Sequence, residues 1–344
     1  MIHTLKSIDH DLDKLHGYIK HMVQHVWCVG GVWSDANLVR AFKTLVDAWD
    51  GEPKRKNKVM PRLKIIHDLF AQLTVAQRQD LHDRFDVNNN VSALCCGSLA
   101  DPLRYAEVES MALVLSKALH GFFDELYSDL MVSAPVRRTY GCRRDHYKAF
   151  MAAQSVKSCP ACGIRDLLTE DNTPVGAYDH FLPKGIYPFS SINFKQLVPI
   201  CDICNGKYKT TKDPLYRDFA SRKAFHPFVA PTIAIGIQVG LPGPLIDEAK
   251  AEEIELKFTS GKQQDEVDTW AWLYGIEEQY RSFANENGKH WAKQIINFSN
   301  RLGQKSAREC YEDHIATYKD QPLRDQHFLR VPFLEECERV GVFN

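Results

Sequence analysis

The chain has 344 residues, of which 44% are hydrophobic and 25% are charged, and its formal net charge is −1. These values predict an ordinary globular protein of two or three modules, and they exclude a chain that attracts nucleic acid over its whole surface. The first 20 residues carry charges throughout and lack the apolar stretch of a signal peptide. The uncharged stretch 226–246 is interrupted by prolines and glycines, which excludes a membrane span. Ten cysteines without an export signal predict reduced thiols and a cytoplasmic protein.

Charge is unevenly distributed along the chain. Residues 137–223 hold 15 Lys and Arg against 8 Asp and Glu, a local charge of +7, whereas the rest holds 28 against 36. A basic middle between acidic ends suits a polyanionic partner, although the same asymmetry also occurs as an ordinary solvated surface.

The first 135 residues predict a helical region, interpreted as a docking or regulatory module. Apolar residues recur at helical spacing in four stretches, near 12–26, 38–46, 61–73 and 101–131, and the last is expected to be one long helix. Ala134-Pro135 marks the expected boundary of this module.

The segment 136–226 is expected to form a second module and 227–344 a third. A basic helix is predicted near 143–154, a short helical stretch after Pro214, a strand pair near 232–239 and 254–259, and helices from Asp265 onward. The aromatic residues of these last helices could stack on bases, but at helical spacing they are interpreted as core: Trp270, Trp272, Tyr274, Tyr280 and Trp291.

Four cysteines form two CxxC pairs, Cys159 with Cys162 and Cys201 with Cys204. Two such pairs present four thiolates to one tetrahedral ion, which predicts a closed, structural Zn²⁺ site. The alternative, four unrelated core cysteines, does not account for two matched pairs in a reducing compartment. The remaining cysteines are interpreted as buried structural thiols: Cys28, Cys95, Cys96, Cys142, Cys310 and Cys337.

Polar residues with the chemistry of phosphodiester hydrolysis lie between and just after these pairs. His180 is suited to activate water, because an unperturbed imidazole titrates near about 6.5. Asp179 and Asn205 offer the oxygen ligands that Mg²⁺ or Mn²⁺ prefers, and Asn193 is placed to fix the loop around His180. Asn205 is expected at the start of a helix that the second cysteine pair opens.

This segment resembles the HNH endonuclease family, of the zinc-ribbon ββα-metal (His-Me finger) type. The resemblance covers about 147–214 and rests on four pieces in the family's order: Cys-x2-Cys, Asp-His-Phe-Leu-Pro-Lys, Asn-Phe-x-x-Leu-Val-Pro and Cys-x2-Cys-Asn-x-Lys. It implies His180 as general base, Asp179 and Asn205 as ligands of the catalytic metal, and Asn193 as the residue that orients the loop. The third position of the motif is Asn205 in place of histidine, a variant that bears on metal preference.

Five lysines near this segment are expected to contact phosphates without reading sequence: Lys184, Lys195, Lys207, Lys209 and Lys212. Two other histidine patterns are interpreted as structural. Asp145-His146 has no cysteine pairs around it, and His21 with His25 lacks a third ligand.

The expected fold is therefore α+β and mostly helical, with a zinc-stapled ββα-metal core between helical N- and C-terminal regions. The expected function is metal-dependent cleavage of nucleic acid, with DNA favoured and RNA possible. A looser similarity, to HNH subunits of bacterial antiphage systems of the Septu type, implies a role in defence and an ATPase partner. Two alternatives remain open: a nucleic-acid-binding zinc module without catalysis, and an adaptor whose zinc unit only joins the helical flanks.

Overall fold

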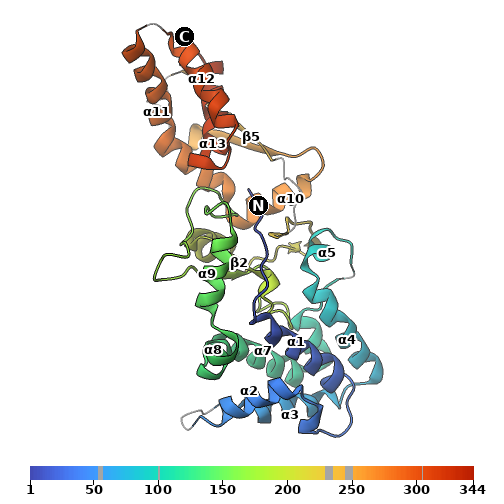
Figure 1. The fold of residues 1–344 in the computed structure, drawn as a ribbon. Coiled ribbons are helices and arrows are strands. Elements are labelled where there is room, and N and C mark those ends of the chain that lie inside the picture. Colours follow the sequence, from blue (N-terminus) through green and yellow to red (C-terminus); the bar gives the residue numbers. More distant parts are fainter. Residues whose placement is uncertain (53–56, 100, 229–234, 245–250, 304) are drawn as a thin grey trace.

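The computed structural model describes residues 1–52, 57–99, 101–228, 235–244, 251–303 and 305–344. Helices dominate, and three small antiparallel strand pairs lie between and beside them, so the α+β, mostly helical class is confirmed. N-terminal helices gather at one end of the molecule and the C-terminal helices of residues 276–339 project at the other, with the cysteine segment between them (Figure 1).

The N-terminal region is helical, as its apolar spacing predicts. Its elements are α1 (Asp13–His21), the π-helical η1 (Met22–Trp27), η2 (Asp35–Asn37), α2 (Arg40–Asp50), α3 (Val59–Phe70), α4 (Val75–Asn89), α5 (Val91–Cys95), α6 (Tyr105–Met111), α7 (Leu113–Ser128) and η3 (Leu130–Val132). The single helix expected over 101–131 is wrong. The backbone of Ala112 is extended, at φ −160° and ψ 98°, and it divides this stretch into α6 and α7, which pack on each other.

The middle region is built from short elements. They are α8 (Ala134–Tyr140), α9 (Arg143–Ala153), β1 (Tyr178–His180), η4 (Phe194–Gln196), β2 (Leu197–Pro199), the π-helical η5 (Cys204–Lys209), β3 (Tyr216–Arg217) and β4 (Ala220–Ser221). The strands β1 and β2 pair antiparallel, with Asp179 opposite Val198 and His180 opposite Leu197. The short helix expected after Pro214 is wrong, because this stretch forms the β3–β4 hairpin.

The C-terminal region contains β5 (Gly236–Gly240), η6 (Ala251–Glu253), β6 (Glu255–Thr259), α10 (Gln264–Tyr274), α11 (Ile276–Leu302), α12 (Ala307–Lys319), η7 (Arg324–Gln326) and α13 (His327–Arg339). The expected strand pair forms as β5 and β6, paired from Gly236 opposite Thr259 to Gly240 opposite Glu255. The first residues of the expected strand, 232–234, lie outside the described residues.

Two hydrophobic cores meet at the β1–β2 pair. One core joins the N-terminal helices to the loop that precedes β2, and Leu197 belongs to it. The other joins the cysteine segment to the C-terminal helices, and Val198 belongs to it. Because neighbouring side chains of a strand point to opposite faces, β2 contributes to both cores and is held between them. The adjacent residues of β1, Asp179 and His180, are fixed by the same packing.

Candidate nuclease site beside a four-cysteine cluster

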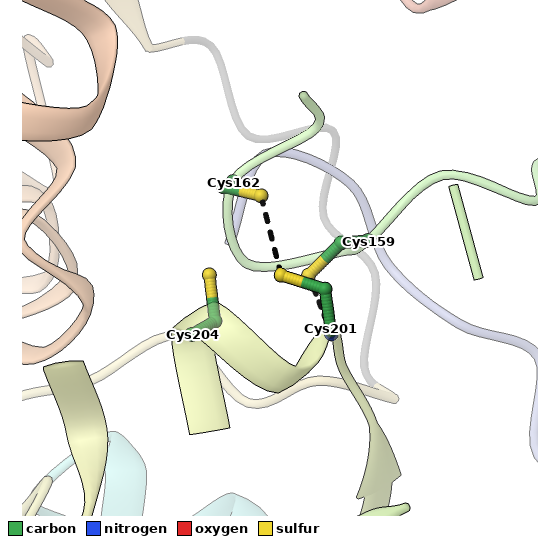
Figure 2. Close-up of side chains that lie close together, drawn as sticks. All are labelled: Cys159, Cys162, Cys201 and Cys204. Atoms are coloured by element: carbon green, nitrogen blue, oxygen red, sulfur yellow. Dashed lines mark hydrogen bonds between the residues drawn. The ribbon is translucent and has the colours of Figure 1, made fainter. Parts of the chain in front are cut away.

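The two CxxC pairs converge on one point, as Figure 2 shows. All four side chains are buried, and their sulfur atoms lie within 4.8 Å of one another. The Sγ atoms of Cys162 and Cys201 are 3.9 Å apart, and the backbone N–H of Cys201 donates to Cys159 Sγ at 3.3 Å. Gly163, with a φ of +67°, makes the turn that follows the first pair. Four buried thiols in this arrangement are compatible with a structural zinc ion.

The C-terminal helices hydrogen-bond the cysteine cluster from outside. The side-chain amide of Gln279 donates to Cys204 Sγ at 3.5 Å, and the Tyr280 hydroxyl donates to the carbonyl of Cys162 at 2.9 Å. The indole of Trp270 donates to the carbonyl of Ala161 at 2.7 Å. These aromatic residues are buried, which agrees with their interpretation as core. Contacts of this kind orient metal ligands in known sites.

His180 is held in one orientation by the loop between β1 and β2. Its Nε2 lies 2.9 Å from the carbonyl oxygen of Ser191. A carbonyl oxygen only accepts, so Nε2 carries the proton and Nδ1 keeps its lone pair. The ring meets the edge of Tyr127 at a centroid distance of 4.4 Å. Burial, followed by the nearby Lys184, lowers the pKa of His180 to about 4, so the imidazole is neutral near pH 7.

Asn193 shapes the loop that holds His180. Its side-chain oxygen accepts from the backbone N–H of Lys195 at 3.0 Å, and its amide donates to the side chain of Asn89 in α4 at 2.9 Å. The side chain of Asn193 is buried. It therefore ties the loop that carries the Ser191 carbonyl to the N-terminal helices.

Asp179 forms a buried ion pair with Lys209. Lys209 Nζ lies 2.8 Å from Asp179 Oδ1 and 2.8 Å from the carbonyl of His180, and both side chains are almost fully buried. Burial raises the pKa of Asp179, and the Lys209 ammonium partly opposes that shift. The second carboxylate oxygen, Oδ2, is buried and has no hydrogen-bond partner within the described residues. The phosphate contact expected for Lys209 is therefore wrong, because this ammonium is enclosed.

Asn205 lies in η5, about one turn of that π-helix before Lys209. Because Lys209 contacts both Asp179 and the His180 backbone, this face of η5 lies against β1. Carboxylate and amide oxygens are the ligands that a hard divalent cation prefers, so Asp179 and Asn205 have the chemistry to hold one. The Lys209 ammonium already occupies Oδ1 of Asp179, which leaves Oδ2 as the carboxylate oxygen open to an ion.

The other lysines expected to contact phosphate differ in whether their ammonium groups already have partners within the protein. Lys207 is exposed and has no partner in the part of the chain that the structure describes. Lys184 pairs with Asp124 and lies 5.4 Å from the Tyr127 ring centre. Lys195 donates to the carbonyl of Ile8 at 2.8 Å and also pairs with Asp9, and Lys212 donates to the Trp272 carbonyl at 3.0 Å.

Two residues around His180 were not predicted as part of the site, Asp124 and Tyr127, and they are joined there by Arg143 from the predicted basic helix. Arg143 lies 4.9 Å from the Tyr127 ring centre, and its charge also disfavours protonation of His180. Arg143 had a sequence signal, because it begins the basic helix predicted near 143–154. Asp124 and Tyr127 had none, because both lie within the helical spacing of α7.

The remaining histidines and cysteines have structural surroundings. His146 is buried, and its Nδ1 lies 2.5 Å from the Tyr178 hydroxyl. The ring centroids of His21 and His25 are 5.3 Å apart, and among the described residues the four cysteines are the only group of three or more His, Cys, Asp or Glu side chains close enough to hold a metal. Cys28, Cys95, Cys310 and Cys337 are buried, but Cys96 is exposed and Cys142 is half-exposed, so the expectation of burial is wrong for these two.

The chain matches no protein-family model, no curated protein and no solved structure. Within the described ranges, no helix combines the length and apolarity that a membrane crossing requires.

Proposed function

We propose that this protein is a metal-dependent endonuclease of the HNH type, in which His180 activates the attacking water. The observation that carries the proposal is the hydrogen bond from His180 Nε2 to the Ser191 carbonyl. It leaves Nδ1 as the basic nitrogen, and the lowered pKa keeps that nitrogen unprotonated at neutral pH. A strand pair followed by a short helix, closed by four cysteines, supports the same proposal.

The residues around His180 have separate roles in this proposal. Asn193 fixes the loop whose carbonyl orients the imidazole. Lys184, which pairs with Asp124, and Arg143 place two cations near His180, and Arg143 has no ion pair among the described residues, which favours the approach of a phosphate. Asp179 and Asn205 would hold Mg²⁺ or Mn²⁺, which supplies charge stabilisation at the phosphate when it is bound. A Zn²⁺ ion on the four cysteines would hold η5 against β1.

Cleavage of supercoiled DNA, linear DNA and structured RNA tests the proposal, with Mg²⁺ or Mn²⁺ supplied. His180→Ala is expected to lose at least about a hundredfold in rate, which is the lower range for a general base. His21→Ala is the matched control, because it removes a histidine far along the chain from the site. Zinc content should be the same in all three proteins.

Two outcomes favour the alternatives. If the wild type and His180→Ala bind nucleic acid equally and neither cuts, the protein is a binding module. If neither binds even at low salt, where phosphate contacts are strongest, it is an adaptor. Equal cutting by both proteins would refute the role of His180.

A further inference from the structure

A fully exposed phenylalanine stands at the tip of the β3–β4 hairpin. Phe219 is 100% exposed, whereas the other large hydrophobic residues of the hairpin and its surroundings are at least partly covered. Arg217 pairs with Ala220 and Tyr216 with Ser221, so only Asp218 and Phe219 form the turn. A ring in this position gains nothing from burial.

The turn holds Phe219 in a backbone conformation that phenylalanine disfavours. The φ angles of Asp218 and Phe219 are 51° and 65°. Two-residue hairpin turns with both central residues at positive φ strongly prefer Asn-Gly or Asp-Gly. A bulky residue at positive φ is strained, and strained residues persist mainly where they serve a function. Glycine at 219 would suit this backbone better, so local stability does not explain the ring.

The base of the hairpin is fixed to the candidate nuclease site. The guanidinium of Arg104 lies 3.8 Å from the Tyr216 ring centre and 2.9 Å from Asp213. Asp213 also accepts from the hydroxyl of Tyr187, at 2.6 Å, and Tyr187 lies in the same β1–β2 loop that orients His180. These contacts hold the base of the hairpin in place. At the rise of a strand, the tip extends only about 10 Å beyond Tyr216.

Two cations lie close to Phe219 in the chain. Arg217 is 42% exposed, pairs with the turn residue Asp218 at 3.6 Å and lies 5.0 Å from the centre of the Trp272 ring, and Lys223 is exposed just past β4. Proteins that kink DNA insert a projecting apolar side chain between two base pairs, while nearby cationic side chains contact the phosphates. Phe219 has this form. It is not a pocket, so it cannot receive a flipped base.

We propose that Phe219 is a wedge that inserts between stacked base pairs of a duplex held at the candidate nuclease site. The inference rests on the proposed function for its substrate, and it narrows that substrate to double-stranded nucleic acid distorted next to the cleavage position. Unstacking one base step is unfavourable, and the new contacts of a bent duplex offset that cost.

Binding to a fluorescent DNA duplex carrying 2-aminopurine tests the wedge, in a His180→Ala background with Mg²⁺ so that the duplex stays uncut. Phe219→Gly is expected to weaken duplex binding about tenfold, within the range of one lost stacking contact. It should also abolish the rise in 2-aminopurine fluorescence that reports unstacking. Because glycine relieves the turn, the same variant should melt about 1–2 °C higher than its parent.

Two further variants complete the test. Phe219→Trp keeps a ring at the tip and should retain both binding and the fluorescence rise. Phe298→Ala, which removes a 43%-exposed phenylalanine from α11, should change neither. Unchanged duplex binding and fluorescence in Phe219→Gly would overturn the wedge, as would a loss confined to single strands. Either result leaves the His180→Ala cleavage test unaffected, so the two proposals fail separately.

Discussion

The ion pair of Asp179 and Lys209 places two opposite charges in the interior of the protein, 2.8 Å apart. Removing one partner of such a pair leaves the other charge buried and uncompensated, which costs more than the pair itself contributes. Lys209→Met should therefore lower the free energy of unfolding by about 3–5 kcal/mol, measured by urea denaturation.

Lys207→Met is the matched control for this change, because it removes an exposed lysine from the same short helix. A surface substitution of this kind should change the free energy of unfolding by no more than about 0.5 kcal/mol. Equal, small effects of both substitutions would show that Asp179 does not depend on Lys209.

His146 makes the stability of the folded protein depend on pH. Burial, followed by the charges of His10 and Lys195, lowers its pKa to about 3, whereas an unfolded histidine titrates near about 6.5. Below about pH 6.5 the unfolded chain therefore binds a proton that the folded chain excludes, and stability falls with decreasing pH down to the folded pKa. Between pH 7.5 and pH 5 this single group costs about 2 kcal/mol.

His146→Phe removes the titrating group and keeps a ring within the aromatic cluster of Phe194 and Tyr178. At pH 7.5 the variant should be about 1–3 kcal/mol less stable than the wild type, because the Tyr178 hydroxyl loses its partner. At pH 5 that difference should shrink by about 2 kcal/mol. Urea unfolding at the two pH values measures both quantities, and a constant difference would contradict the burial of a neutral His146.

Helices α11 and α13 pack so closely that a glycine is required between them. A Cβ at Gly288 would lie 2.1 Å from the ring of Phe333, whereas a Cβ at Gly17 in α1 would have no atom within 4 Å. Both glycines lie inside helices, where alanine is intrinsically better by about 1 kcal/mol. Gly17→Ala should therefore raise the melting temperature and Gly288→Ala should lower it, because the Phe333 ring must move out of its packing. An increase for both would mean that α13 can shift away from α11 at little cost.

The elements that could be predicted from the sequence are those with a clear periodic spacing of apolar residues. The N-terminal helices and the β5–β6 pair form where the apolar periodicity predicts them. The spacing of the four cysteines alone predicts that they form one cluster. The break at Ala112 carries neither proline nor glycine, so nothing local distinguishes it from helix interior. The turn at Asp218 and Phe219 could not be predicted either, because both residues have positive φ and such turns prefer glycine at the second position.

The sequence named candidate residues for the site, but it did not predict the contacts between them. Lysine is rarely buried, so the enclosure of Lys209 depends on a carboxylate 30 positions away in the chain. The partner of His180, the Ser191 carbonyl, is a backbone atom that no sequence pattern marks. Tertiary contacts of this kind become visible only when the two strands are paired.

The cysteine cluster joins parts of the chain that are far apart in sequence. The C-terminal helices bond to its backbone and sulfur atoms, and the first residues of the chain bond to it as well, through Ile2 to the carbonyl of Pro160 at 2.8 Å. These contacts belong to one hydrophobic core, whereas α2 and α3 belong to the other. An ion on the four cysteines would therefore stabilise one core directly and the other indirectly, through the β1–β2 pair that contacts both.

Removal of this ion by a strong zinc chelator tests that division. Backbone amides of β1, β2 and α10 should lose protection against hydrogen exchange, because metal binding contributes to the folding free energy of the segment that it closes. Amides of α2 and α3 should keep most of their protection, since their core does not include the cysteines.

Cys201→Ser should reproduce the effect without chelator and bind less than one zinc per chain. Cys96→Ser, at an exposed thiol outside the cluster, should bind zinc like the wild type. Loss of protection in α2 and α3 at the same chelator concentration would instead mean that the two cores unfold as one cooperative unit, with β2 transmitting the loss from one to the other.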